Sequence, residues 1–275
     1  MSAAPLASAR RLLLVLSVLS ALTIVAAAIA VFIGSAPISA RGVIDALIGR
    51  GGDVEDLVVL GLRLPRIAAA LLAGGALAVV GVGFQALTRN PLADPSILGV
   101  SSGAAFAVVL AQLFGVGTTA VAVLGLTAFA FAGALAVFGA LLAGGVWLIL
   151  GRARQLNMLA LGEEAALQLG VEAERLKLRV FIGSSLLTAA VVAFAGPIGF
   201  VGLIVPHAVR LVLGPDNRML VPAALLAGAT FLLVADTVAR NVIAPAEISV
   251  GVITAFCGAP FFIYLLRSRY RSSQP

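Results

Sequence analysis

The chain has 275 residues, of which 61% are hydrophobic and 11% are charged. This composition excludes an ordinary soluble globular domain, and the single cysteine, Cys257, excludes a disulfide framework within the chain. Because the basic residues behind the net charge of +6 cluster in short loops between apolar runs, they indicate membrane topology and no nucleic-acid partner. We therefore expect an all-α, polytopic transmembrane helix bundle that contacts membrane lipid.

Two apolar runs predict the first two membrane crossings. Residues 12–33 form a first span that leaves the cytoplasm, and residues 34–62 form an outside segment. Residues 67–87 carry no charge and return inward. Gln85, near the inner end of this span, is expected to hydrogen-bond another helix or to line a path through the protein.

A turn and a new helix follow the second span. Asn90-Pro91 ends the span, because a residue that precedes proline is disfavoured in the α-helix. Asp94 then fits the N-cap of a third span at residues 96–114. Gly99 and Gly103 lie one turn apart on it and allow another backbone to approach closely. We assign Gln85, Asn90, Pro91, Gly99 and Gly103 to the path or to helix packing.

The remaining spans follow from length and charge. Residues 119–150 are too long for one straight crossing and too short for two with a turn. The basic loop at 151–177 requires an odd number of crossings, so we predict one long, tilted or kinked helix. With both termini cytoplasmic, thirteen of the 18 basic residues lie inside. About eight spans result, the last four at residues 180–195, 198–205, 223–237 and 248–266.

A short helix is predicted within the cytoplasmic loop. Glu163 and Glu164 lie in its first turn, where the helix dipole favours acidic residues, and Gly170 fits the left-handed residue that ends it. Ala165, Ala166 and Leu169 would give it a small apolar face. The alternative is a surface helix that lies on the bilayer.

The sequence offers no pattern for catalysis or for a metal centre. His207 is the only histidine, and it has no accompanying set of Asp, Glu, Cys and Met ligands. The chain has neither a phosphate-binding loop motif nor a nucleophile elbow. We expect no enzyme activity, no cofactor and no bound metal, and any ATP hydrolysis would belong to a separate chain.

Four motifs together carry a family resemblance. They are the string from Arg63 to Ala105, Asn157 to Glu163, Gly196 to His207, and Gly251 to Leu265. The sequence resembles the FecCD-like permease subunits of ABC importers for iron-siderophores, haem and cobalamin. The resemblance implies a single permease domain over residues 1–275 with two related helical halves. It also implies a homodimer with two ATPase subunits and one extracytoplasmic substrate-binding protein.

The resemblance also implies two docking sites. The segment at 155–177 would dock into the ATPase through a coupling helix, with Gly162, Glu163, Glu164, Ala166, Leu169 and Gly170 as its residues. On the outer face, Arg63, Arg66 and Arg240 would pair with carboxylates of the binding protein. Without the resemblance, Arg240 would be explained by snorkelling or by an ion pair with Asp236.

The chain departs from the family in its middle. The family has ten helices, whereas here the segment at 128–134 runs almost directly to Gln155, so two crossings are missing. Iron-siderophore is the expected cargo, with haem and cobalamin left open. The alternatives are a family member that assembles without transporting and a stand-alone secondary transporter, for which Asp236 is the one intramembrane acid.

Overall fold

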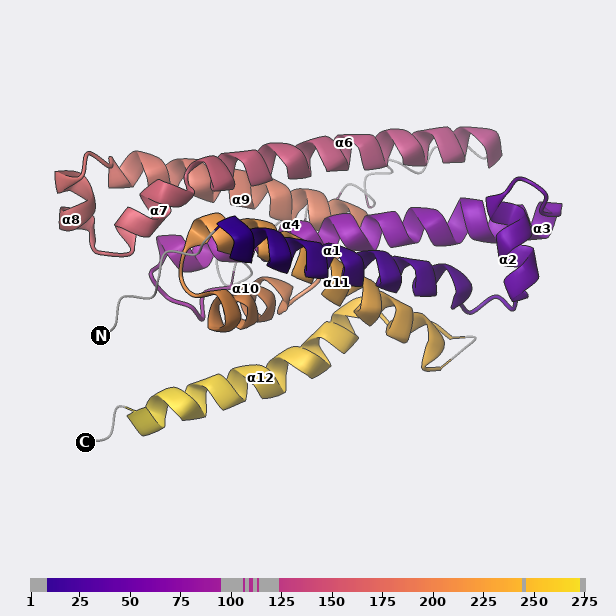
Figure 1. Cartoon of the computed structure of the whole chain (residues 1–275). Coiled ribbons are helices and arrows are strands. Elements are labelled where there is room, and N and C mark those ends of the chain that lie inside the picture. The colour runs from indigo at the N-terminus through magenta and orange to yellow at the C-terminus, as the bar shows by residue number, and fades with distance from the viewer. Residues whose placement is uncertain are drawn as a thin grey trace.

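The structure is a computed structural model that describes residues 9–94, 106, 109–110, 113, 124–243 and 246–272. Every regular element within these residues is helical, which confirms the all-α prediction. Figure 1 shows an elongated bundle in which the longest helices, apart from the last, lie roughly side by side. These are α1 (Ala9–Phe32), α4 (Leu64–Leu87), α6 (Leu124–Gly151), α9 (Ala173–Ala195), α11 (Asn217–Asn241) and α12 (Val250–Ser272).

Shorter helices gather mainly at the two ends of the bundle (Figure 1). One end holds α2 (Ala40–Leu47), α3 (Asp53–Asp56) and the π-helix η1 (Leu57–Arg63), and we call it the α3 end. The other holds α7 (Ala153–Leu159) and α8 (Glu163–Gln168), and we call it the α8 end. Helix α1 begins and α12 finishes toward the α8 end. A further helix, α10 (Val201–Leu213), lies beside α11.

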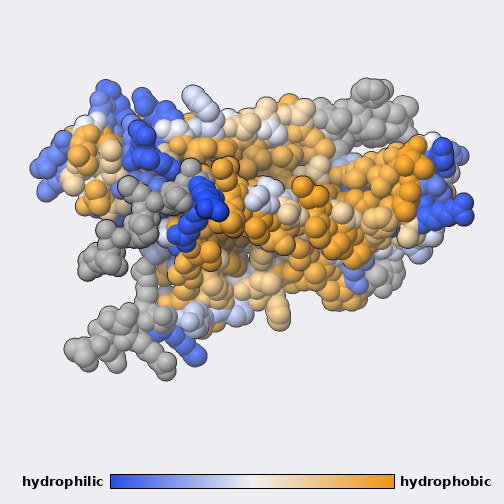
Figure 2. Space-filling view, viewed as in Figure 1, coloured by the Kyte–Doolittle hydropathy of each residue, from blue (hydrophilic) through white to orange (hydrophobic). Residues whose placement is uncertain are grey.

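The bundle has the dimensions and surface of a membrane protein. Four helical stretches in the described part of the chain are long and apolar enough to cross a bilayer: Arg10–Phe32, Asp53–Leu87, Ala173–Ala195 and Asn217–Asn241. Helices α6 and α7 form a fifth candidate that bends by 50° at their junction. Figure 2 shows a hydrophobic belt between hydrophilic ends. The count of eight spans stays a prediction, since the third span lies largely outside the described residues, as do Gly99 and Gly103.

Helix α4 is the central element, and α11, α9, α10 and α6 all pack against it. Two glycine pairs set the closest approaches. A Cβ atom on Gly74 would collide with the backbone carbonyl of Gly228 in α11, and one on Gly81 would collide with that of Gly202 in α10. Small residues at such crossings let backbones meet and maximise dispersion contact where lipid provides no hydrophobic driving force.

The structure describes most of one predicted span and two predicted segments between spans. Residues 124–150, the described part of the predicted span 119–150, form one uninterrupted helix, and the number of crossings that they make stays a prediction. Residues 34–62, predicted as an outside segment with no stated structure, contain three helical segments, and the last two run continuously into α4. Residues 206–222 are also largely helical, because α10 continues through Pro206 to Leu213 and α11 begins at Asn217.

A buried side chain explains why Pro206 does not end α10. Proline has no N–H to donate to the carbonyl four residues earlier, which belongs to Gly202. The Nε2 atom of Gln85 in α4 donates to that carbonyl at 3.4 Å and to the carbonyl of Leu203 at 3.2 Å. Its Oε1 atom accepts from Arg210 at 3.3 Å. Gln85 is 1% exposed and therefore packs helices together, which was one of its two predicted roles.

Candidate functional site

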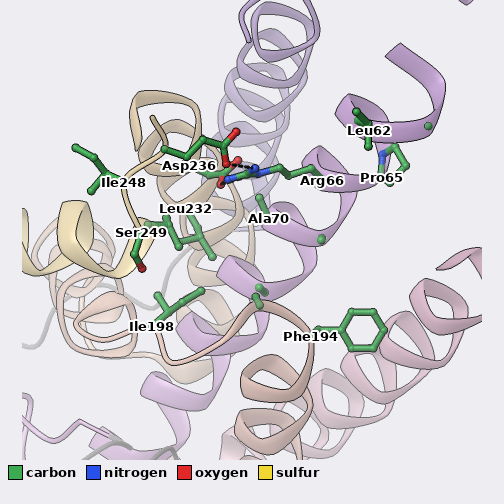
Figure 3. A pocket seen from close by; sticks show the side chains of 16 residues that line it. Leu62, Pro65, Arg66, Ala70, Phe194, Ile198, Leu232, Asp236, Ile248 and Ser249 are labelled. Atoms are coloured by element: carbon green, nitrogen blue, oxygen red, sulfur yellow. Dashed lines mark hydrogen bonds and ion pairs between the residues drawn. The ribbon is translucent and has the colours of Figure 1, made fainter. Parts of the chain in front are cut away.

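A charged cluster lies at the α3 end, where α4, α11 and the loop before α12 meet. The guanidinium of Arg66 donates to Asp236 at 3.1 Å and to Glu247 at 2.7 Å. Asp236 also pairs with Arg240, one turn later in α11, at 3.1 Å. Figure 3 shows Arg66 and Asp236 reaching toward each other across the mouth of a pocket. We call Arg66, Asp236, Arg240 and Glu247 the clasp.

Two of the three predicted docking arginines are buried, which corrects the expectation that they are exposed. Arg63 is 4% exposed and donates to the carbonyls of Val31 and Ala36, each at 2.7 Å. Arg240 is 3% exposed. The end of α1 and the loop after it enclose the guanidinium of Arg63, whereas that of Arg240 is paired with Asp236 within α11. Only Arg66, with its side chain 39% exposed, is accessible from outside the chain.

Glu247 belongs to the clasp although nothing in the sequence assigned it a role. Its hydrogen bond from Arg66 is the main reason why the pKa of Glu247 lies below its ordinary value. Ser35, in the loop after α1, is 3.4 Å from the same carboxylate. No sequence pattern links residues 35, 66, 236 and 247, because their proximity arises only when four segments assemble.

The pocket below the clasp has a volume of about 650 Å³ and a largely apolar wall. Ala70, Ile198 and Leu232 line its depth, and Phe194 stands at one side (Figure 3). Its charged groups lie at the rim, where Arg66 pairs with both Asp236 and Glu247. Among the described residues, no three of His, Cys, Asp and Glu come together as metal ligands would. The pocket is suited to apolar material beneath a polar rim.

The helix that we predicted for the cytoplasmic loop is present as α8, and it terminates at Gly170 as predicted. Gly170 has φ of 79°, in the left-handed region. Its N–H donates to the carbonyl of Leu167 at 2.9 Å, and that of Val171 donates to Ala166 at 2.9 Å. These two bonds form the Schellman motif, which stops a helix sharply and satisfies its last carbonyls. Gly162, with φ of 123°, begins the helix, so α8 is a short, firmly bounded unit.

The apolar face of α8 differs from the predicted one. Ala166 is fully buried against the rest of the chain, so it anchors α8 and is not accessible to a partner. Leu167 and Leu169 are 67% and 56% exposed, and Leu161, just before the helix, is 72% exposed. Leu167 was not predicted, because the inward side of a six-residue helix depends on its neighbours.

Ion pairs connect α8 to two long helices. Glu163 lies 2.9 Å from Lys177 of α9 and 3.4 Å from Arg89, which follows α4. The hydrogen bond from Lys177 is the main cause of a lowered pKa for Glu163. All three side chains are substantially exposed, and such pairs contribute little to stability. Glu164 lies exposed in the first turn of α8.

A more enclosed polar joint fixes α7 to the beginning of α11. Asn157 of α7 donates through Nδ2 to Asp216 at 2.7 Å. Its Oδ1 atom accepts from the backbone N–H of Asn217 at 2.9 Å and from the Asn217 side chain at 2.8 Å. Asp216 is the N-cap of α11 and accepts from the N–H of Arg218 at 3.0 Å. We call Asn157, Asp216 and Asn217 the asparagine joint.

The other predicted residues have structural surroundings. Asn90 Oδ1 accepts from the N–H of Leu92 at 3.0 Å, so it shapes the turn that contains Pro91 after α4. His207 lies in α10 with its ring 5.8 Å from that of Phe261 in α12, in an edge-to-face arrangement. Neither residue lies at the clasp or at the asparagine joint.

Comparison with known proteins adds independent information. The model of the FecCD transport family matches residues 22–145 and 135–268. A cobalamin import system permease of Halobacterium salinarum is 40% identical, over 79% of this chain and 75% of the relative. A ferric enterobactin transport system permease of Escherichia coli is 36% identical, over 91% of this chain and 94% of the relative. A solved structure, described as an inward-facing conformation of a putative metal-chelate type ABC transporter, superposes with a TM-score of 0.77 at 30% identity. That superposition covers 93% of this chain and 99% of the solved chain.

The E. coli relative and the family model bear on the predicted shortening. The alignment with the E. coli relative runs over 316 residues, which exceeds the 275 residues of this chain, so this chain must lack some of them. The two matches to the family model overlap at residues 135–145, within α6. The overlap of the two matches at this point favours the predicted shortening near α6.

Proposed function

Because this chain belongs to the FecCD transport family, we propose that it is the membrane-spanning permease subunit of an ABC importer that moves a metal chelate inward. The cargo class follows from the names of the relatives together with the chain's own chemistry. The described residues offer no cluster of metal ligands, which favours a cargo whose metal is already coordinated over a bare ion. Within the class we propose an iron-siderophore, with haem and cobalamin as the alternatives.

The geometry of α8 is the observation that carries the proposal. A helix bounded by Gly162 and the Schellman motif at Gly170 exposes Leu167 and Leu169 at one end of the bundle. Two exposed leucines on a firmly anchored unit favour a protein partner, because a rigid contact can transmit a domain movement that a flexible loop would absorb. We propose that α8 docks a separate ATPase, two copies of which serve a permease homodimer.

The docking experiment compares two leucines at opposite ends of the molecule. Leu169→Asp places a charge on the proposed contact, and Leu47→Asp places one on α2, where Leu47 is 46% exposed. The permease is purified with its candidate ATPase and binding protein, and ATPase recovery and substrate-stimulated hydrolysis are measured. We expect Leu169→Asp to lose most of the bound ATPase and Leu47→Asp to retain it. Equal recovery from both variants would remove α8 as the docking element.

The orientation follows from charge. We propose that the α8 end is cytoplasmic, with both termini on that side, since the loop at 151–177 and the C-terminal arginines are basic. The α3 end then faces outward and receives the binding protein, for which Arg66 is the accessible arginine. Arg66→Glu should weaken binding-protein affinity and reduce its salt dependence, whereas Arg41→Glu, whose side chain is 92% exposed at the same end, should change little. Unchanged affinity in Arg66→Glu would exclude this role.

Helix α12 supports a homodimer as the working unit. It makes few contacts with the rest of the bundle and diverges from it in Figure 1. Phe256 and Tyr264 on this helix are 81% and 68% exposed. We propose that α12 lies at the boundary between two copies, with the pathway between them.

The shortened middle favours a second candidate, a permease that assembles but transports poorly. The loss of two crossings, which the family resemblance implies, would remove packing surface beside the path. Measuring both ATPase recovery and uptake in proteoliposomes separates the two candidates, because the second would bind the ATPase but show little uptake. A stand-alone secondary transporter is less well supported, because Asp236 forms ion pairs with both Arg66 and Arg240.

A further inference from the structure

The asparagine joint and the clasp lie toward opposite ends of the same helix. Asp216 and Asn217 begin α11, and Asp236 and Arg240 lie in its last two turns. With 25 residues, α11 spans about 37 Å, which is more than the thickness of a bilayer core. Any displacement of its first turn must therefore be accommodated along a helix that reaches the other side of the membrane.

Helix α11 packs extensively against α4, and the two helices approach most closely near the middle of α11. A Cβ atom on Gly228 would collide with the backbone carbonyl of Gly74, so the two helices touch through their backbones there. Packed interfaces of this kind do not compress, and helices that share one can only rock or slide about it. Because α11 is one continuous helix from Asn217 to Asn241, with Pro222 in its second turn, rocking about Gly228 would displace Asn217 and Asp236 together.

We infer that Asn157 is a positioning residue that fixes the ATPase-side segment α7–α8 to the beginning of α11, so that α11 acts as a lever on the clasp. This inference rests on the proposed function, since it needs an ATPase that moves α8. The lever turns about the Gly74–Gly228 contact. At its far end, displacement of Asp236 changes the contact with Arg66, and Arg66 in turn holds Glu247 and the loop before α12.

The asparagine joint is better suited to this task than the ion pairs of α8. Glu163, Lys177 and Arg89 are exposed, so water competes for each contact and the side chains can reorient. Asn157 instead uses both ends of one amide, with partners at 2.7, 2.8 and 2.9 Å, and one of those partners is a backbone N–H. Asn217 is 3% exposed. Several directed bonds to a helix N-terminus transmit both displacement and rotation.

The chemistry of the joint permits a reciprocal exchange. Asn157→Asp loses the amide donor and sets a carboxylate against Asp216, so the joint should open. Asn157→Asp with Asp216→Asn restores it, because the new amide can donate to the new carboxylate. The carboxylate still accepts from Asn217, and asparagine remains a good N-cap. Gln155→Glu adds the same charge to an exposed position of α7 and is the matched control.

The experiment measures movement at the α3 end in the assembled importer. Spin labels are placed at Val54 and Val242, which are 63% and 60% exposed, in a Cys257→Ser background. Their separation is measured in nanodiscs with the ATPase bound, with and without a non-hydrolysable ATP analogue. We expect a nucleotide-dependent change in the unmodified chain and in Gln155→Glu. We expect its loss in Asn157→Asp, with ATPase still bound and uptake reduced about tenfold.

Restoration by the double exchange distinguishes positioning from a general loss of structure. The inference is overturned if Asn157→Asp keeps the nucleotide-dependent change, if the unmodified chain shows none, or if the exchange does not restore it. Where Asn157→Asp does not fold, Asn157→Ala opens the joint without adding charge and is judged by the same criteria. Failure of the unmodified chain to bind an ATPase is a separate result, which overturns the proposed function and the lever with it.

Discussion

Asp236→Asn should strongly destabilise the protein, although the substitution barely changes the size of the side chain. The substitution keeps the shape of the side chain but removes the carboxylate that Arg240 pairs with at 3.1 Å. The side chains of Asp236 and Arg240 are 9% and 4% exposed, so the arginine cannot turn to water. Removing one partner of a buried pair leaves an uncompensated charge, and the usual cost is about 3–5 kcal/mol. Arg66 contributes less to this loss because it keeps Glu247.

The chain contains a matched control for this prediction. Arg41 and Asp45 form another ion pair four residues apart on a helix, at 3.7 Å, with side chains 92% and 37% exposed. Asp45→Asn should therefore change the free energy of unfolding by less than about 0.5 kcal/mol. A second substitution, Arg240→Met on top of Asp236→Asn, should recover part of the loss by removing the stranded charge.

Free energies of unfolding in detergent micelles, measured by chemical denaturation, provide the comparison. The reasoning requires the order Asp45→Asn smallest, then the double variant, then Asp236→Asn. If Asp236→Asn and Asp45→Asn differ by less than the error of the measurement, burial does not govern the clasp. If the double variant is less stable than Asp236→Asn, the stranded charge is not the source of the cost.

Three further predictions test packing, helix termination and pH dependence. Gly81→Ala forces a methyl group into another helix's backbone and should lower stability by about 1–3 kcal/mol, whereas Gly144→Ala in open space should not; thermal unfolding compares them. Gly170→Val should cost at least about 1–2 kcal/mol at its positive φ and reduce ATPase recovery, while Gly170→Asn should be tolerated. Arg66 lowers the pKa of Glu247, so the resulting stabilisation should be full above the unfolded-state pKa and lost as pH falls through the folded one. When stability is measured as the pH is lowered, Glu247→Gln should lack this loss of stability. An unchanged pH profile would contradict the stabilising role of the Arg66–Glu247 pair.

Local features of this fold could be predicted because they depend on neighbouring residues. The end of α8 at Gly170 needs only a residue that adopts a left-handed conformation, followed by an apolar one. The single helix of α6 follows from its uncharged length and from the charge of the next loop. Both were found where the sequence placed them.

Features that depend on distant residues could not be predicted in the same way. The predicted short span ended before Pro206, and the side chain that lets the helix continue, Gln85, lies more than a hundred residues earlier. Arg63 was expected to be exposed because it lies outside the apolar run, whereas carbonyls after α1 enclose it. No sequence pattern indicated that Glu247 would pair with Arg66. Each case required knowledge of which helices meet.

The central position of α4 has a consequence for the order of assembly. Its tightest partners, Gly202 and Gly228, are synthesised well over a hundred residues after Gly74 and Gly81. At the usual 5–20 residues per second, α4 waits on the order of ten seconds in the membrane before α10 and α11 exist. During that interval the glycine-bearing faces of α4 can contact only lipid or the helices that are synthesised before α10. Chains cut before residue 217 should therefore insert yet remain loosely packed and open to membrane proteases, and the last third of the sequence completes a core that begins in the first.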